Sequence, residues 1–207
     1  MLSNQKIIHL PISFYLRDSV TQIAKELIGA KLCSFKDGAL TSGIIVETEA
    51  YEGITDKASH AYNNRRTPRT EIMFQEGGVA YVYLCYGMHH LFNVVTNVKG
   101  VPHAVLIRAI YPTDGNETMK QRTGKKQINF KATNGPGKLS KALGIQTSDT
   151  GENLTENKIW IEKPIIKINK SDIITGPRIG VDYAGEDALL PYRFCLSNNH
   201  SLPDYGN

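Results

Sequence analysis

This sequence contains few of the features that form disulfides, bind zinc or cross membranes. Its 207 residues include only three cysteines, with no CxxC pair, and they are far apart at Cys33, Cys85 and Cys195. Such spacing argues against a disulfide framework and favours reduced thiols inside a cell. No apolar run approaches the roughly 20 residues that cross a bilayer, and residues 1–17 lack the continuous apolar segment of a signal peptide. We therefore expect a cytoplasmic protein, nucleoid-associated if bacterial, with no membrane contact.

Net charge is also small. The formal value of +4 does not by itself identify a binding partner. Basic residues nevertheless gather in two stretches, of which one contains Arg65, Arg66 and Arg69. The other contains Lys120, Arg122, Lys125, Lys126, Lys131, Lys138 and Lys141. Each stretch alone is equally typical of a solvated, mobile loop. Because the two flank an acidic and aromatic segment, together they favour a track for a polyanion.

The chain shows no repeat, low-complexity segment or linker, so we expect one domain over residues 1–207. Hydrophobic periodicity and turn residues predict helices at residues 20–28, 116–122 and 138–143, and strands at 31–35, 41–51, 79–85, 91–98, 104–110, 159–161 and 193–196. The connections between successive strands are short, which favours antiparallel pairing. The sequence therefore predicts an α+β fold: a single compact domain with a curved antiparallel β-sheet, flanking helices and a protruding β-hairpin.

The predicted strand at 41–51 ends in an acidic and aromatic pattern. Strand alternation predicts that Glu47, Glu49 and Tyr51 share one face, while Val46, Thr48 and Ala50 share the other. A carboxylate at the end of a half-buried strand, beside a flat ring and close to the imidazole of His60, can activate water and hold a planar base.

A second motif runs from Tyr81 to Met88. Tyr81 and Tyr83 should share a strand face, whereas Tyr86 follows the strand at a turn that Gly87 makes possible. An exposed ring at a hairpin tip can enter the base stack through the minor groove and fill the space of a nucleotide rotated out of the helix. Ordinary strand tyrosines with solvated hydroxyls are the alternative, which we prefer for Tyr81 alone.

These motifs resemble those of the alkyladenine (3-methyladenine) DNA glycosylases shared by mammals and many bacteria. The similarity spans nearly the whole chain in order, so it is more specific than any single short motif. The matching segments are Ala24–Gly29, Val46–Tyr51, His60, Thr67–Arg69, Met73–Phe74, Tyr81–Met88, Asn93, Leu106–Ala109, Glu117–Met119, Asn134–Leu139 and Arg178–Val181.

The resemblance implies a monofunctional DNA glycosylase that flips alkylated or deaminated purines out of duplex DNA and hydrolyses the N-glycosidic bond, which initiates base excision repair. It implies that Glu49 is the general base and that Arg108 helps to hold the attacking water. The base pocket would be lined by Tyr51, His60, Tyr83 and Asn93, with Asn93 obstructing the exocyclic amine of normal guanine. Tyr86 would be the wedge inserted into the duplex.

Binding of double-stranded DNA would use the basic stretches. We expect Arg65 and Arg69 to contact the DNA backbone, and the glycine-rich turn before Lys138 to hold a phosphate through backbone amides. This turn is not a nucleotide-triphosphate loop, because Leu139 stands where that motif needs Ser or Thr. Water as the nucleophile predicts hydrolysis without strand nicking. We expect no metal at His89 and His90, no cofactor, no obligate protein partner, and a monomer.

Glu47 is assigned no catalytic role by the resemblance, and we expect it to form an ion pair with an arginine. Two other classes of function stay open on the sequence alone. The chain could be a non-catalytic module that binds damaged DNA or structured RNA, or a hydrolase of free nucleosides, which would not need the wedge. The preference among damaged purines does not follow from the residues, because small changes in pocket shape decide it.

Overall fold

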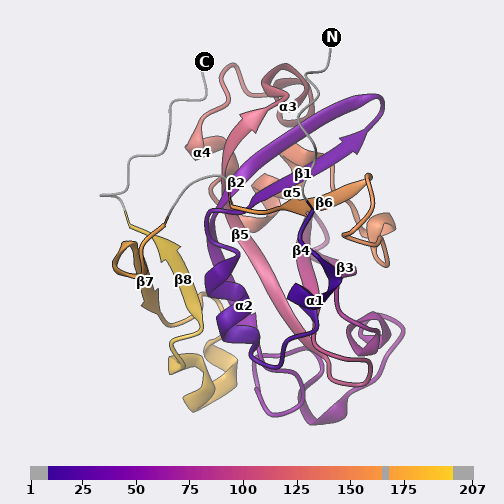
Figure 1. Ribbon diagram of the computed structural model, residues 1–207, viewed down its shortest axis with the longest axis vertical. Coiled ribbons are helices and arrows are strands. Elements are labelled where there is room, and N and C mark those ends of the chain that lie inside the picture. The colour runs from indigo at the N-terminus through magenta and orange to yellow at the C-terminus, as the bar shows by residue number, and fades with distance from the viewer. Residues whose placement is uncertain (1–8, 165–167, 198–207) are drawn as a thin grey trace.

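Eight antiparallel strands form one open sheet in the computed structural model, which describes residues 9–164 and 168–197 (Figure 1). Six strands follow the order β3-β4-β5-β2-β1-β6, while β8 pairs with both β2 and β7. The strands are β1 (Lys31–Lys36), β2 (Ala39–Tyr51), β3 (Ala80–Cys85), β4 (His89–Thr96), β5 (His103–Asp114), β6 (Ile159–Glu162), β7 (Ile173–Gly176) and β8 (Arg193–Leu196). The predicted α+β fold is confirmed. Residues 1–8, part of the segment that we expect to lack a signal peptide, lie outside the described residues.

The helices are short and lie between and beside the strands. They are α1 (Ile12–Tyr15), α2 (Val20–Glu26), α3 (Asn116–Thr123), α4 (Phe130–Thr133) and α5 (Pro136–Leu143), with 3-10 helices η1 (Tyr62–Asn64), η2 (Glu71–Phe74), η3 (Thr147–Asp149), η4 (Lys170–Asp172) and η5 (Asp182–Leu189). The three predicted helices are confirmed as α2, α3 and α5. Helix α2 begins as predicted, because the Ser19 hydroxyl accepts a hydrogen bond from the Gln22 N–H at 3.2 Å.

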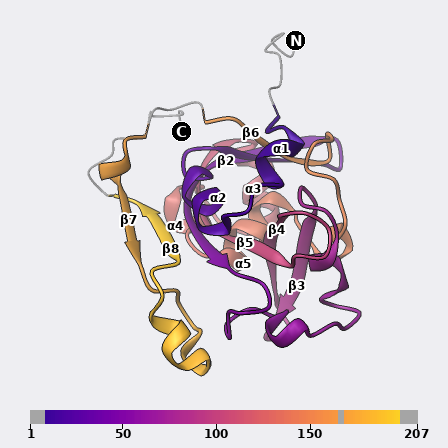
Figure 2. The same cartoon turned by 60° about the horizontal axis from the view of Figure 1, so that its bottom comes forward.

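The sequence did not predict much of the secondary structure in the C-terminal region. Strand β7 and helix η5 were not expected, although β8 was. These elements form an arm along one side of the sheet, where β8 pairs with the end of β2 (Figures 1 and 2). Along one edge, strand β2 pairs with two different strands. Its first half pairs with β1, and its second half pairs with β8. This branching brings residues near the C-terminus beside Glu49.

The pairing of β2 with β5 is irregular at three places, one of which leaves Thr113 without a partner in register. The other two are bulges on either side of Glu47, where Val46 in β2 and Arg108 in β5 have no partner in register. A bulge adds a residue to one strand, so it breaks the alternation of side chains. The expectation that Val46 shares a face with Thr48 and Ala50 is therefore wrong. Val46 packs instead with Ile44 and Ala109 in a small separate cluster.

The strands separate two environments. One face is sealed by α2 and α5, and it buries Val82, Phe92, Val105 and Ile107 with the apolar residues of those helices. The Thr48 hydroxyl on this face donates to the carbonyl of Ala24 in α2. The opposite face of β3, β4, β5 and β2 is not covered by α2 or α5 and carries a different set of side chains. The long loop between β2 and β3 packs against one end of that face through a smaller cluster of Ala61, Met73, Phe74, Tyr81, Val95 and Ala104.

None of the described helices is long and apolar enough to cross a membrane.

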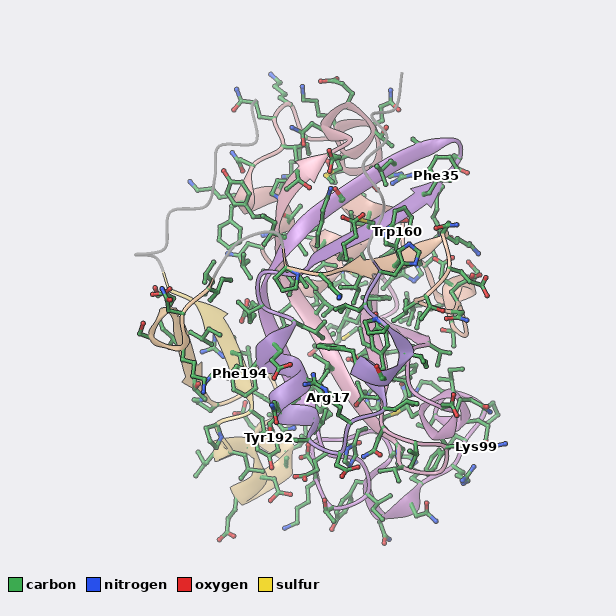
Figure 3. The ribbon with its side chains drawn as sticks, in the orientation of Figure 1. Arg17, Phe35, Lys99, Trp160, Tyr192 and Phe194 are labelled. Carbon is green, nitrogen blue, oxygen red and sulfur yellow. The ribbon has the colours of Figure 1, made fainter. Side chains whose placement is uncertain are left out.

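Phe92 lies fully buried on the sealed face of β4, so its removal should test how firmly that face holds the strands. We expect Phe92→Ala to lower the free energy of unfolding by about 3–5 kcal/mol, through lost burial and the cavity left behind. Urea denaturation measures this. Phe35→Ala is the matched control, because Phe35 is 49% exposed near the end of the β1–β2 hairpin (Figure 3). The control should change stability by less than about 0.5 kcal/mol. Equal losses in the two variants would contradict the assignment of the core to the sealed face.

Candidate active site

Four residues that are far apart in the sequence form one row across the open face of the sheet. Tyr81 in β3 pairs with Asn93 in β4, Asn93 pairs with Leu106 in β5, and Leu106 pairs with Glu49 in β2. Paired residues of neighbouring strands project to the same face. The sheet therefore brings four of the segments singled out in the sequence onto one surface.

A cavity of about 400 Å³ opens over this surface. Its lining includes Tyr51 from β2, Tyr81 and Tyr83 from β3, Leu91 and Asn93 from β4, Ala104, Leu106 and Arg108 from β5, His60 from the loop before η1, Tyr86 from the hairpin tip, Lys138 from α5, and Ile179 and Tyr183 from the C-terminal arm. Rings and apolar side chains dominate, with a few polar groups among them. This is the lining expected for a flat, mostly apolar ligand that is oriented by a small number of polar contacts.

An aromatic cluster forms one part of the wall. The His60 and Tyr83 rings meet edge to face, with centroids 4.6 Å apart, and His60 Nδ1 lies 2.8 Å from the Tyr81 hydroxyl oxygen. Burial, together with the positive charges of Arg69 and Arg65, lowers the pKa of His60 to about 4. At neutral pH the imidazole is therefore uncharged. It offers a flat ring and a hydrogen bond to the site, but no positive charge.

Glu49 lies directly behind the cavity wall. Its side chain is fully buried, and three groups donate to its carboxylate. The Tyr51 hydroxyl donates to Oε2 at 2.8 Å, the Ile179 N–H donates to Oε1 at 2.7 Å, and Arg108 Nη1 lies 3.2 Å from Oε2. Glu49 itself does not line the cavity, but these three partners do. A carboxylate oxygen can accept two hydrogen bonds, so Oε1 retains an acceptor position for a further donor such as water.

Burial raises the pKa of Glu49 above its usual value. The positive charge of Arg108, the Ile179 N–H and the Tyr51 hydroxyl each act in the opposite direction, and the negative charge of Glu47 raises the pKa again. The net shift is upward. A carboxylate with a raised pKa is a stronger base than an ordinary surface glutamate, which suits it to accept a proton near neutral pH.

The bulge at Arg108 determines how the guanidinium reaches two carboxylates. Its Nε lies 3.1 Å from Glu47 Oε1, while Nη1 contacts Glu49. Glu47 is also held by Arg193 Nη1 at 3.2 Å, so the predicted ion pair between Glu47 and an arginine is confirmed. The bulged Arg108 carbonyl accepts from the Gly135 N–H at 3.0 Å, which ties the start of α5 to the site.

The hairpin between β3 and β4 ends beside the cavity. Tyr86 and Gly87 both have positive φ, at 50° and 70°, and the Met88 N–H bonds back to the Cys85 carbonyl at 3.1 Å. This tight turn leaves Tyr86 89% exposed. A left-handed conformation costs a non-glycine residue roughly 1–2 kcal/mol. Strain of this kind is often retained at functional sites, and here it accompanies a ring raised into solvent.

The predicted phosphate-binding residues divide into two groups. Arg65 and Arg69 are exposed but do not line the cavity, although both are close enough to affect His60. Lys138 is exposed and lines the cavity at the start of α5. All three can therefore meet an anion.

Two other basic residues of the same stretches have structural partners. Arg66 pairs with Glu71 at 2.8 Å and lies over the Phe74 ring. Arg122 donates to the Thr41 hydroxyl and to the Ala142 carbonyl near the end of α5. These two side chains are therefore engaged within the fold, while the track for a polyanion stays a prediction.

Sequence reasoning missed four residues of the site. Tyr81 was interpreted as an ordinary strand tyrosine with a solvated hydroxyl, but it is buried, bound to His60 and part of the cavity wall. Ile179 contributes a backbone N–H, which no side-chain pattern can reveal. Tyr183 lines the cavity from η5, and Arg178 is buried beside Tyr51. The sequence signal for Arg178 was its place in a segment matching a known family, without an assigned role.

Among residues 9–164 and 168–197, no group of three or more histidine, cysteine or acidic side chains is arranged to hold a metal ion. The His90 ring nitrogen instead accepts from the Thr147 N–H at 3.2 Å. The three cysteines are unpaired.

The open antiparallel sheet carries an aromatic cavity, with a carboxylate behind its wall and an exposed ring beside it. Comparison with known proteins gives the class of protein: residues 13–200 match the family model described as "Methylpurine-DNA glycosylase (MPG)".

Similar proteins include one from Chlamydia felis, 49% identical over 189 residues that cover 91% of this chain and 96% of the relative. Another, from Bacillus cytotoxicus, is 48% identical over 197 residues, with the same coverage of 91% and 96%. Both carry the name "Putative 3-methyladenine DNA glycosylase". The chain belongs to the methylpurine-DNA glycosylase family.

Proposed function

We propose that this DNA glycosylase removes alkylated or deaminated purines from duplex DNA by flipping the damaged nucleotide into the cavity and hydrolysing its N-glycosidic bond. The observation that supports this most directly is the position of Glu49, which is fully buried behind the cavity wall and held there by three donors. The names of the relatives indicate 3-methyladenine as one lesion of this class. Release of the base would initiate base excision repair.

The proposed chemistry uses one water molecule. Glu49 Oε1 accepts a hydrogen bond from this water, and Arg108 helps to hold it. The water oxygen forms a bond to the anomeric carbon of the nucleotide while the bond from that carbon to the purine nitrogen breaks. The bonding electrons leave with the purine, and the water proton passes to Glu49. A cationic alkylated purine leaves as the neutral base, whereas an uncharged deaminated purine takes up a proton from solvent as it leaves. The products are a free base and an abasic site.

The rings of Tyr51, His60 and Tyr83 favour the damaged base. An alkylated purine is electron-poor or cationic, so it stacks well on electron-rich rings. A neutral His60 does not repel such a base, whereas a protonated one would. Asn93 adds discrimination, because its side chain lies in the same row of the sheet, where it can obstruct the exocyclic amine of guanine.

Lys138 needs consideration, because an amine at the site could attack the sugar and nick the strand. We expect Lys138 to lie beside a DNA phosphate, and it also lines the cavity. Its side chain is exposed, so it lacks the apolar burial that activates amine nucleophiles. We therefore still expect simple hydrolysis.

The defining measurement is release of free base from methylated duplex DNA and from an oligonucleotide containing hypoxanthine. We expect release without strand nicking until alkali or an abasic endonuclease is added, and an equal rate with and without EDTA. A nick that appears with the enzyme alone would overturn the monofunctional assignment. Loss of activity in EDTA that added Mg²⁺ or Zn²⁺ restores would overturn the metal-independent mechanism.

Asn93 should control the rejection of normal guanine. Its Nδ2 donates to the Tyr81 carbonyl at 3.1 Å and the Leu91 carbonyl at 3.2 Å, so the amide is fixed in the wall and cannot swing away from a bulky base. We expect Asn93→Ser to raise release of undamaged guanine, relative to hypoxanthine, by roughly 10-fold or more, since one steric contact of this kind corresponds to about 1–3 kcal/mol. Chromatography of the bases released from untreated DNA and from the oligonucleotide containing hypoxanthine measures this ratio. An unchanged ratio would remove Asn93 from discrimination.

A further inference from the structure

A buried ion pair lies just beyond the catalytic carboxylate. Arg178 and Asp56 have side chains that are 0% and 1% exposed, and they meet in a two-fold contact in which Arg178 Nη2 donates to Asp56 Oδ1 at 2.8 Å and Nη1 donates to Oδ2. Nη1 also donates to the Ala50 carbonyl, and Nη2 donates to the Asp187 carbonyl, each at 3.0 Å. The planar guanidinium thus joins the end of β2, the loop after it and helix η5.

The next residue in the chain contacts Glu49. The Ile179 N–H donates to Glu49 Oε1 at 2.7 Å, so one peptide unit separates the buried ion pair from the carboxylate. The Ile179 side chain is 52% exposed, and open space surrounds the neighbouring Gly180. Side-chain packing at these two positions does little to fix the backbone. The anchor on the N-terminal side is Arg178, which also lies over the Tyr51 ring at 4.8 Å.

We propose that Arg178 and Asp56 form a positioning clamp, which holds the Ile179 N–H against Glu49 and thereby keeps the carboxylate oriented and negatively charged for its reaction. The inference rests on the proposed function, since it explains how the base of that reaction is kept in place. Arg178 touches neither the cavity nor the proposed water, and is a positioning residue.

The alternative is that the pair only stabilises the fold. Buried ion pairs are weak sources of stability, because removing two charges from water costs about as much as their attraction returns. The buried Arg178–Asp56 pair is therefore better explained by a role other than stability of the fold. The hydrogen bond from Ile179 to a negatively charged oxygen supplies one, because a donor to the charged form of an acid favours that form.

Several charged and titratable groups face Glu49 from the surrounding elements, and any of them influences its ionisation. They are Glu47 and Tyr51 on β2, Tyr83 on β3, Arg108 on β5, Arg178 before η5, Tyr183 on η5, and Arg193 on β8, which pairs with Glu47. A test of the clamp must therefore separate loss of the Ile179 hydrogen bond from a simple change of nearby charge.

Asp56→Asn makes that separation, because the two explanations predict shifts of opposite sign. If the clamp acts through the Ile179 N–H, weakening it releases the donor and raises the pKa of Glu49, so the acid limb of the rate profile moves to higher pH. If only charge matters, removal of the Asp56 carboxylate leaves Arg178 uncompensated and lowers the pKa of Glu49, so the limb moves to lower pH. A purely structural role leaves the limb unmoved.

Arg178→Lys gives a second and independent test. Lysine retains the positive charge but loses the planar fork that bridges Asp56, Ala50 and Asp187. The clamp predicts a shift to higher pH again, whereas the charge explanation predicts none. In both variants we expect the rate at neutral pH to fall by about 10-fold or more, the size expected when a hydrogen bond to a charged group is lost.

The experiment is single-turnover release of hypoxanthine from duplex DNA between pH 5 and pH 9, with folding checked by circular dichroism at the assay temperature. Asp149→Asn is the control, because Asp149 forms another buried ion pair, with Lys36, outside the cavity lining. It should lower stability and leave the acid limb in place. Absence of release by the wild type would reject the proposed function itself. An active wild type with the limb unmoved, or moved to lower pH, in the folded clamp variants would reject the clamp alone.

Discussion

Replacing Glu49 with glutamine should reduce base release by at least about 100-fold while lesion binding persists. Loss of a positioned general base typically costs about 10²–10⁴-fold. Glutamine has nearly the same shape, and its one carbonyl oxygen at the Oε1 position can still accept from the Ile179 N–H. Its amide nitrogen at the Oε2 position can donate to the Tyr51 hydroxyl oxygen, so the wall of the cavity should survive. What the amide cannot do is take a proton from water.

The pH profile strengthens this test. A general base at Glu49 would act only when its carboxyl is ionised. Burial raises the pKa of this carboxyl, so we expect the wild-type rate to fall as the pH is lowered toward that pKa. Glu49→Gln should abolish this limb together with the activity. Single-turnover assays give the rates, and gel-shift titration with lesion DNA gives the binding.

Glu47→Gln is the matched comparison. Glu47 lies on the same strand and also contacts Arg108. Unlike Glu49, it forms an ion pair with Arg193, which does not belong to the cavity wall. Its loss should reduce the rate far less than the loss of Glu49. Normal turnover by Glu49→Gln would remove Glu49 from the mechanism, and tight binding without release by the wild type would favour a non-catalytic DNA-binding module.

Local patterns predicted most of the sheet correctly. The alternation of residues 79–85 placed Tyr81 and Tyr83 on one face, and both line the cavity. The Asp37-Gly38 pair is typical of a tight turn, and both residues have positive φ, at 54° and 74°, in the turn between β1 and β2. These features depend on neighbours along the chain, which is why sequence reveals them.

The missing parts depend on long-range contacts. The bulges at Val46 and Arg108 follow from the pairing of β2 with β5, and alternation within a single strand cannot reveal them. The hydrogen bond from the Ile179 N–H to Glu49 depends on the pairing of β8 with the end of β2. The row from Tyr81 to Glu49 likewise requires the order β3-β4-β5-β2. Candidate residues could therefore be chosen from sequence, while their common cavity and the role of Arg178 needed the tertiary structure.

Tyr86→Ala should lower base release from duplex DNA by roughly 10- to 100-fold. Unstacking a nucleotide costs a few kcal/mol, and an aromatic ring that stacks in its place returns about 1–3 kcal/mol per base. The Tyr86 ring is 89% exposed, so its truncation removes little internal packing. The free energy of unfolding should change by less than about 0.5 kcal/mol. Rates on duplex DNA and urea denaturation measure the two effects separately.

The control is Tyr86→Phe, which keeps the ring and should retain most of the activity. A second comparison uses the same lesion in single-stranded DNA, where no base stack has to be opened, and the Tyr86→Ala defect should shrink there. This pattern also separates two classes of enzyme. A hydrolase of free nucleosides has no use for a ring raised beside its cavity, so Tyr86→Ala would leave its activity intact. A defect confined to duplex substrates ties the exposed ring to extraction of the base, because the ring then matters only where stacking must be replaced.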